Sequence, residues 1–129
     1  MLDFQFLGTS AGIPTKNRNV TALAIGQTAS KPWLLVDCGE ATQQQILQTP
    51  WSANTLSAIC ITHVHGDHCY GLPGMLASAG LNKRTQPLIL IAPLPLWQWL
   101  QHTIALTDLY LSFELQFVDV TTLLTQSHA

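Results

Sequence analysis

Charged residues are scarce in this sequence: Asp, Glu, Lys and Arg together make up 9% of its 129 residues, whereas globular domains usually carry about a quarter. The formal net charge is −2, so the sequence does not support a general electrostatic attraction to nucleic acid. Hydrophobic residues make up 47%, which excludes a disordered chain, because that much apolar surface must be buried. Part of a surface so poor in charge is expected to be covered, by a partner or by further chain.

Cysteine is also rare, and targeting signals are missing. The three cysteines, Cys38, Cys60 and Cys69, form no CxxC pair, which argues against a disulfide framework and fits a reducing compartment. The first residues, MLDFQFLG, lack the basic region of a secretory signal peptide. The longest apolar stretch, residues 88–100, is interrupted by prolines and is too short to span a bilayer. We therefore expect a cytoplasmic protein without a membrane segment, folded as one domain over residues 1–129.

Apolar runs and breaker residues divide the sequence into strands and helices. Predicted strands cover residues 2–7, 20–25, 33–36, 56–61, 88–91 and 113–118. Predicted helices cover residues 40–48, about 72–79, and 94–106. Strands come first and then alternate with helices, which indicates an α/β layered fold, and the continuous apolar strands suggest a sheet covered on both faces. In the first helix we expect Ala41, Ile46 and Leu47 to point inward.

The strongest chemical signal is the segment THVHGDH, residues 62–68, which directly follows a predicted buried strand. His63 and His65 are two positions apart, so they can point to the same side of an extended backbone. Gly66 permits a turn that could bring Asp67 and His68 back to the same cavity. Imidazole and carboxylate donors suit zinc, and also manganese or iron. The plainer alternative is a histidine-rich surface loop.

The HxHxDH pattern on a strand-end loop resembles the metallo-β-lactamase superfamily of binuclear metal hydrolases. The resemblance implies an αβ/βα sandwich fold, of which this chain would supply the N-terminal half. It also implies that His63 and His65 bind a first metal, and that Asp67 and His68 bind a second. The motif alone leaves thiolesterase, lactamase, phosphodiesterase and nuclease activities open.

Further segments resemble one branch of that superfamily, the ribonuclease Z family of endonucleases that trim the 3′ end of precursor tRNA. The similarity runs from about residue 3 to about residue 95 and includes FLGTSAGIP (6–14), RNVT (18–21), DCGE (37–40), Gln43 and GLPG (71–74). We assign no chemistry to the GLPG segment, which we expect to shape the turn into a helix.

The segment PTKNRN (14–19) matches the family's PxKxRN loop, which implies that Lys16, Arg18 and Asn19 contact the tRNA substrate. Cations and amide donors of this kind suit phosphate or ribose contacts; the plainer alternative is a solvated polar turn. Asp37 ends a predicted buried strand, so it could bond loop backbone, hold a metal-binding histidine in place, or simply cap the turn. We expect Lys83 and Arg84 to form a solvated loop that could touch RNA, and Cys69 to serve packing.

The resemblance implies hydrolysis of a phosphodiester at two zinc ions, which activate water and stabilise charge on the phosphoryl oxygens. Asp67 would then be the catalytic carboxylate, binding the second metal and orienting or deprotonating the attacking water. The family's substrate is precursor tRNA, and its members are usually homodimers.

The sequence departs from the family pattern because the downstream ligands and the protruding tRNA-binding arm are not among these residues. A third histidine for the first metal, a bridging aspartate and a further histidine are all absent, so we expect a truncated form with an incomplete metal site. Two alternatives remain open. One is another phosphodiesterase of the same fold that acts on cyclic nucleotides or small diesters, and the other is a catalytically incomplete fragment.

Overall fold

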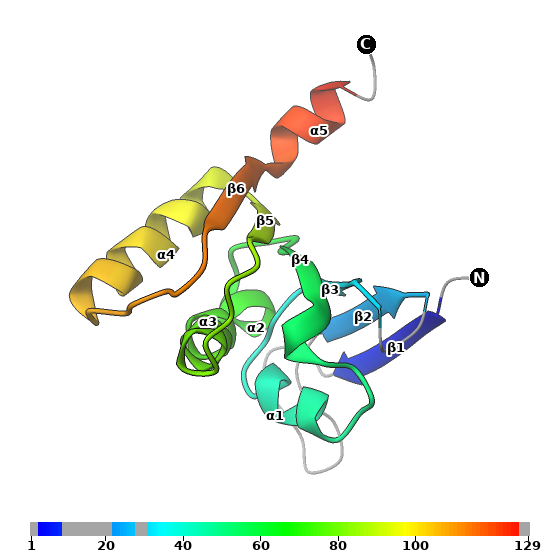
Figure 1. The fold of residues 1–129 in the computed structure, drawn as a ribbon. Coiled ribbons are helices and arrows are strands. Elements are labelled where there is room, and N and C mark those ends of the chain that lie inside the picture. The colour runs from blue at the N-terminus through cyan, green and yellow to red at the C-terminus, as the bar shows by residue number, and fades with distance from the viewer. Residues whose placement is uncertain (1–2, 9–21, 28–30, 127–129) are drawn as a thin grey trace.

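The structure is a computed structural model that describes residues 3–8, 22–27 and 31–126 (Figure 1). Its strands form one mixed sheet in which the order in space equals the order in the sequence. The strands are β1 (Asp3–Gly8), β2 (Ala22–Gly26), β3 (Trp33–Val36), β4 (Leu56–Cys60), β5 (Leu88–Ala92) and β6 (Leu115–Asp119). The pairs β1–β2 and β2–β3 are antiparallel, and the pairs from β3 to β6 are parallel.

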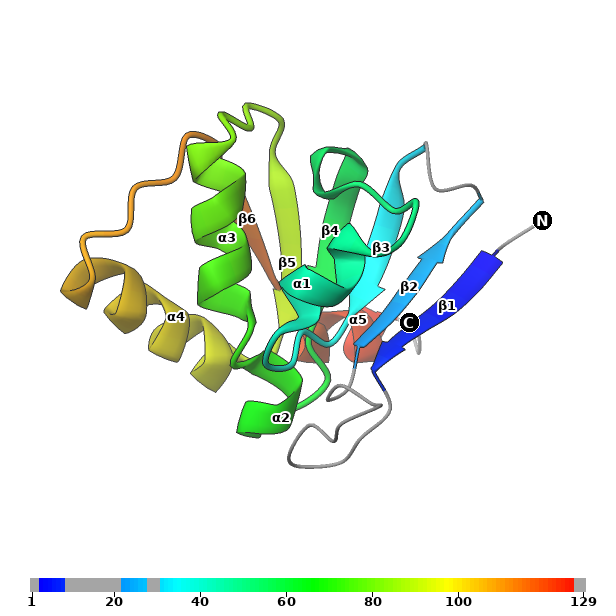
Figure 2. The same ribbon diagram turned by 90° about the horizontal axis from the view of Figure 1, so that it is seen from below.

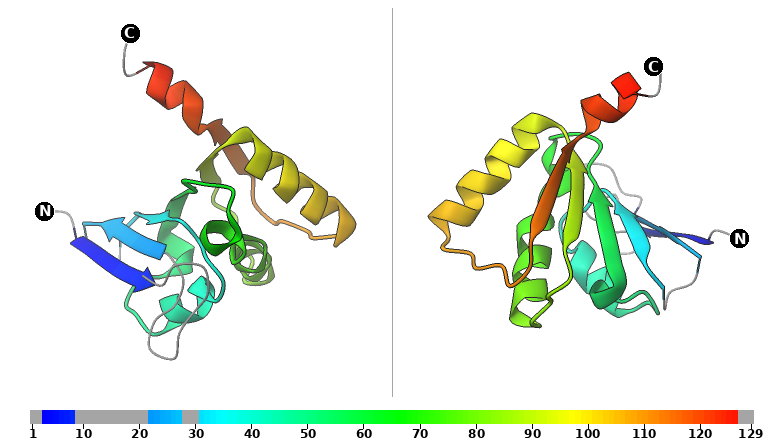
Figure 3. Two further views of the ribbon diagram at one scale, coloured as in Figure 1. Left: turned by 180° about the vertical axis from the view of Figure 1, so that it is seen from behind. Right: turned by 45° about the horizontal axis from the view of Figure 1, so that its top comes forward.

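Helices connect the parallel strands. They are α1 (Thr42–Leu47), the short 3₁₀ helix η1 (Ala53–Thr55), α2 (Gly66–Cys69), α3 (Leu72–Leu81), α4 (Leu94–Leu106) and α5 (Val120–Gln126). Because parallel crossovers are right-handed and the strands are added in one direction, α1, α3 and α4 are expected on the same face of the sheet. Figures 2 and 3 show α1 and α3 on one face of the sheet, with α4 next to α3 beyond the edge of the strands. Among the described helices, none is long and apolar enough to cross a membrane.

The hydrophobic core lies between the sheet and this helical layer. Trp33, Leu35, Ile59 and Leu90 alternate along the strands and are at most 2% exposed. On the helical side the fully buried partners include Leu72 and Leu76 of α3 and Leu96 and Leu100 of α4. The exposure of strand residues therefore alternates with the period of two that a sheet covered on one face requires.

The opposite face of the sheet is apolar but largely open in the described part of the chain. The strand register places Phe4 beside Ile25 and Phe6 beside Leu23. Ile25 and Leu23 in turn pair with residues of β3. Phe4 is 62% and Phe6 69% exposed. The expectation of a sheet covered on both faces is therefore wrong for the described residues, because the sequence of crossovers places the helices α1, α3 and α4 on one side only. We call this surface the open face; its members are Phe4, Phe6, Leu23, Ile25, Leu34, Val36 and Ile89.

Two smaller expectations also need correction. In α1 Ile46 is buried as expected, but its buried neighbour on the same face is Thr42, and Leu47 is 80% exposed. Thr42 and Ile46 are four positions apart and share one helical face, whereas Leu47 lies about 100° around the helix from Ile46. Arg84 is buried and does not belong to a solvated loop. Its guanidinium donates to the backbone carbonyls of Ala53, Gln86 and Pro87 at 2.9–3.1 Å, and these acceptors make the burial of a charge possible.

Candidate metal centre

The THVHGDH segment lies at the edge of the sheet where the carboxyl ends of β3 and β4 meet. Asp37 directly follows β3. Residues 62–68 follow β4, from which only Ile61 separates them. Backbone hydrogen bonds join the two strand ends, because the Asp37 N–H donates to the Cys60 carbonyl at 2.7 Å and the Cys38 N–H to the His68 carbonyl at 2.8 Å. Open α/β sheets bind their ligands at this edge.

Three of the predicted metal ligands lie together. The rings of His63 and His68 are stacked with centroids 4.5 Å apart and an interplanar angle of 19°, and the rings of His63 and His65 lie 5.6 Å apart. His63 and His65 are exposed, whereas the side chain of His68 is 18% exposed. Gly66, where a turn is expected, is the first residue of the short helix α2, which also contains Asp67. The side chain of Asp67 lies outside the described parts, as do Lys16, Arg18 and Asn19.

Asp37 is buried, and its carboxylate faces the histidine segment. One oxygen, Oδ1, accepts the backbone N–H of Thr62 at 2.8 Å, and Oδ2 lies 2.8 Å from Nδ1 of His68. Asp37 adopts the left-handed backbone conformation with φ 61°, which Asp and Asn tolerate better than most residues. The carboxylate therefore bonds both the loop backbone and one of the predicted metal ligands.

Sequence reasoning missed Thr62. Its hydroxyl oxygen lies 2.9 Å from each carboxylate oxygen of Asp37 and 2.7 Å from Nδ1 of His63. The signal that could have found it is its position, since it is the residue between the buried strand β4 and the first histidine.

Gly71, at the start of α3, packs against the loop that carries Asp37. The Gly71 N–H donates to the Cys38 carbonyl at 3.0 Å. A Cβ atom at Gly71 would lie 2.1 Å from the backbone oxygen of Gly39, so only glycine allows this approach. The GLPG segment thus fixes α3 against the loop that carries Asp37.

Of the cysteines near the site, Cys38 and Cys69 are buried in the core and Cys60 is half-buried. Burial raises the pKa of Cys38 to about 12, with smaller contributions from the neighbouring Cys69 and Asp37, and burial also raises the pKa of Cys60. The Cys38 sulfur contacts Met75 Sδ at 3.8 Å, and Cys69 is 2% exposed. Both side chains are therefore placed in the hydrophobic packing beneath the histidine segment.

The chemistry of the donor set fits a metal ion of the zinc type. Imidazoles are common ligands of zinc, and a metal-binding histidine usually gives its other N–H to a carboxylate, as His68 and Asp37 are placed to do. In the described residues, no group of three or more His, Cys, Asp or Glu side chains is arranged to hold one ion. Within those residues, the donors do not form a closed three-ligand set.

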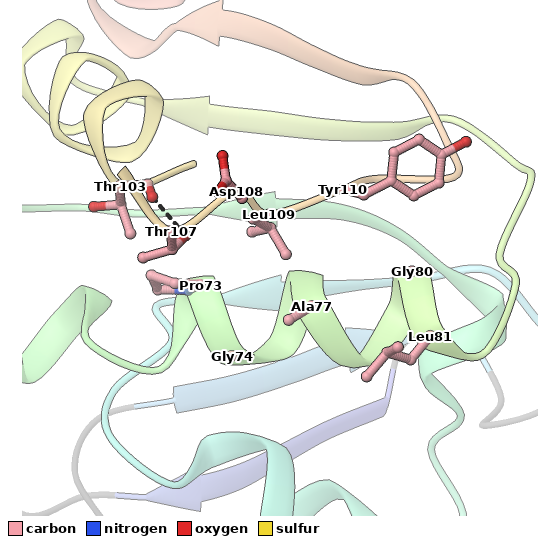
Figure 4. Close-up of a pocket in the computed structure, with 10 residues that line it drawn as sticks. All are labelled: Pro73, Gly74, Ala77, Gly80, Leu81, Thr103, Thr107, Asp108, Leu109 and Tyr110. Atoms are coloured by element: carbon pink, nitrogen blue, oxygen red, sulfur yellow. Dashed lines mark hydrogen bonds between the residues drawn. The ribbon is translucent and has the colours of Figure 1, made fainter. Parts of the chain in front are cut away.

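An apolar groove lies elsewhere, between α3 and the end of α4 (Figure 4). It has a volume of about 570 Å³, and its lining is mostly apolar, with Pro73, Leu81, Leu109 and Tyr110 among its residues. Asp108 is the one ionisable carboxylate in its described lining, so the groove lacks the donor set found at the strand ends.

The chain matches one family model and several curated relatives. The family model described as "Anti-Pycsar protein Apyc1" matches residues 2–123. Ribonuclease Z of Pseudomonas putida strain GB-1 is 56% identical over 119 residues, which are 92% of this chain and 37% of that protein. Ribonuclease BN of Erwinia tasmaniensis is 40% identical over 121 residues, covering 92% of this chain and 40% of the relative. The chain thus spans about two fifths of the length of these curated relatives.

Solved structures agree on the fold. Human tRNase Z, short form, superposes with a TM-score of 0.84 at 33% identity, over 92% of this chain and 45% of that chain. The metallo-β-lactamase fold protein YhfI from Bacillus subtilis gives a TM-score of 0.69 at 18% identity, over 92% and 46%. The chain therefore has the architecture of the metallo-β-lactamase fold, and the likeness to ribonuclease Z fits the N-terminal half of those proteins.

Proposed function

We propose that this chain, which belongs to the family described as Anti-Pycsar protein Apyc1, serves metal-dependent cleavage of precursor tRNA at the 3′ end. The proposal rests on its similarity to the N-terminal half of ribonuclease Z. One observation carries this proposal above the other activities of the fold. The identity to the Pseudomonas putida proteins named ribonuclease Z is 54% to 56% over 119 to 123 residues, which are 92% to 95% of this chain.

The proposed metal ligands are His63 and His65 for one zinc ion, and Asp67 and His68 for a second. Bound zinc would supply a Lewis acid and a water of lowered pKa for attack on phosphorus. The residues of this chain would position that chemistry: Asp37 holds the ring of His68 through Nδ1, and Asp67 is the proposed catalytic carboxylate that orients or deprotonates the attacking water.

The proposed RNA contacts are Lys16, Arg18 and Asn19, whose two cations and amide suit phosphate and ribose. Arg84 is not among them, because its guanidinium is committed to backbone carbonyls. We further propose a homodimer acting in the cytoplasm. The odd number of cysteines and the lack of a CxxC pair in the sequence support a reducing compartment.

A cleavage assay tests the proposal directly. The substrate is a precursor tRNA with a 3′ trailer, incubated with the chain and zinc, and product length is read at nucleotide resolution. His65→Ala should abolish metal-dependent cleavage, whereas His102→Ala, which replaces an exposed histidine on α4, should not. Absence of metal-dependent cleavage by the chain would contradict a working active site within these residues and would leave the alternative of a catalytically incomplete fragment.

The same assay with bis(p-nitrophenyl) phosphate separates the alternative. Turnover of this small diester without cleavage of tRNA would indicate a phosphodiesterase of small substrates. Elemental analysis of the purified chain should accompany both assays. About two zinc ions per chain would mean that the site is completed by another route, such as a partner chain. A value near zero would mean that the histidine segment is a half-site within these residues.

A further inference from the structure

Thr62 stands between a buried carboxylate and a histidine. Its backbone N–H and its hydroxyl both bond Asp37, at 2.8 and 2.9 Å, so two separate contacts fix the position of the residue. The same hydroxyl oxygen lies 2.7 Å from Nδ1 of His63. His68 is held by the same carboxylate directly, with Nδ1 2.8 Å from Oδ2. One aspartate is thus connected to two histidines, once directly and once through Thr62.

We propose that Thr62 is a positioning residue whose hydroxyl fixes the tautomer of His63, so that Asp37 sets the proton positions of both His63 and His68. This inference rests on the proposed function, because it concerns how two of the proposed metal ligands are prepared. It adds a residue outside the HxHxDH pattern to the machinery of the site.

The number of protons available to these groups determines which atoms donate. An ionised carboxylate only accepts hydrogen bonds, and a threonine hydroxyl has one proton to donate. The hydroxyl oxygen lies equally close to both oxygens of Asp37, so its proton points at the carboxylate. Its lone pairs then face Nδ1 of His63. Two acceptors would repel each other at 2.7 Å, so Nδ1 of His63 must carry the proton.

A proton on Nδ1 determines the state of Nε2, the other nitrogen of each ring. A neutral imidazole protonated at Nδ1 carries its ring lone pair on Nε2, and this tautomer is the one that binds a metal through Nε2. Nδ1 of His68 faces Oδ2 of Asp37 and must also carry its proton, so His68 has the same tautomer. The two rings are stacked at 19°. Both histidines are therefore set as Nε2 donors before any ion binds.

Nuclear magnetic resonance of the metal-free chain tests this proposal. Long-range ¹H–¹⁵N correlations of the imidazole rings are recorded at a pH where the rings are neutral. Both His63 and His68 should show the Nδ1–H tautomer in the unchanged chain. Thr62→Val keeps the shape and removes the hydroxyl, so His63 should lose the Nδ1–H form while His68 keeps it.

Two further variants control the result. Thr62→Ser restores a hydroxyl and should restore the Nδ1–H tautomer of His63, even if the valine variant perturbs the loop. Thr107→Val removes a hydroxyl that follows α4 and donates to the Thr103 carbonyl, and it should change neither ring. An Nε2–H tautomer of His63 in the unchanged chain, or a tautomer unaffected by Thr62→Val, would overturn the proposal.

The readout needs neither metal nor substrate. If the tautomers behave as expected but tRNA is not cleaved, the proposed function fails alone. If tRNA is cleaved but the tautomers differ, only the role of Thr62 is lost.

Discussion

At the scale of single residues, Arg84 shows how a cation can stabilise this chain from inside. Its three hydrogen bonds tie the turn before β5 to η1, and its guanidinium lies 5.6 Å from the ring centre of Phe113. Burial lowers the pKa of Arg84, so the carbonyl partners must offset a real desolvation cost.

We expect Arg84→Met to lower the free energy of unfolding by about 2–3 kcal/mol, because it removes charged hydrogen bonds to backbone carbonyls. Urea denaturation followed by circular dichroism measures the loss. Lys83→Met is the matched control, since it removes a charge from the adjacent exposed side chain and should change stability little. Equal effects of the two substitutions would show that net charge, and not the buried contacts, is responsible.

The buried thiol of Cys38 predicts how stability depends on alkaline pH. Burial raises its pKa from 9.0 to about 12, so above about pH 9 the unfolded chain loses this proton while the folded chain keeps it. The unfolded state then binds fewer protons, and the free energy of unfolding must fall as pH rises from about 9 to 12.

At pH 10 the expected loss from Cys38 is about 1 kcal/mol. Urea denaturation at pH 8 and pH 10 measures it, and Cys38→Ala should reduce the difference. The reduction should be partial, because burial also raises the pKa of Cys60. The same pH difference in the alanine variant as in the unchanged chain would exclude Cys38 as its source.

At the scale of elements, the two neighbouring glycines of the GLPG segment have different tasks. A Cβ at Gly71 would overlap the backbone oxygen of Gly39, whereas a Cβ at Gly74 would meet only the Gln43 side chain at 3.7 Å. The first glycine is therefore required by packing, and the second is an ordinary position within α3.

Gly71→Ala should destabilise the chain by more than about 2 kcal/mol, because backbone must move to admit the methyl group. Gly74→Ala should be neutral or should stabilise the chain by up to about 1 kcal/mol, because alanine is the better helix former. Thermal or urea denaturation of the pair measures the contrast. If both variants were equally stable, the approach of α3 to the Asp37 loop would be looser than described.

The elements that could be predicted are those whose signal is local. Strand β3 and helix α4 have the predicted bounds, because each is an uninterrupted apolar or periodic run. Helix α5 was not predicted; its sequence VTTLLTQ is rich in β-branched residues that disfavour helix. The face covered by helices could not be read from apolar content, because the open face is apolar as well.

The candidate site also has a part that could be predicted from local sequence and a part that could not. The histidine segment could be found because its donors are contiguous in sequence. The contact between Asp37 and Thr62 joins residues 25 positions apart, and it exists only because β3 and β4 pair in parallel with their ends aligned. No pattern in either strand encodes that alignment, so the role of Thr62 required the structure.

At the scale of the whole molecule, the open face is the main exposed apolar surface among the described strands. Such patches on isolated chains bind hydrophobic dyes or associate. We expect the folded chain to enhance the fluorescence of anilinonaphthalene sulfonate, and Phe4→Lys with Phe6→Lys to reduce the enhancement.

The control places two lysines on the helical side, at Leu47 and Leu81, which are 80% and 84% exposed but isolated from the open face. These substitutions should leave most of the dye binding unchanged. A larger reduction from the control pair than from the phenylalanine pair would show that the dye binds the helical layer instead.

The sequential strand order also has a consequence for how the chain is made. Each strand after the first pairs with the strand that precedes it in the sequence, so every partner has already left the ribosome when the next strand emerges. Contacts between neighbours in sequence close short loops, which favours rapid folding. The sheet can therefore grow strand by strand during synthesis, and the histidine segment after β4 can join the Asp37 loop before β5 and β6 exist.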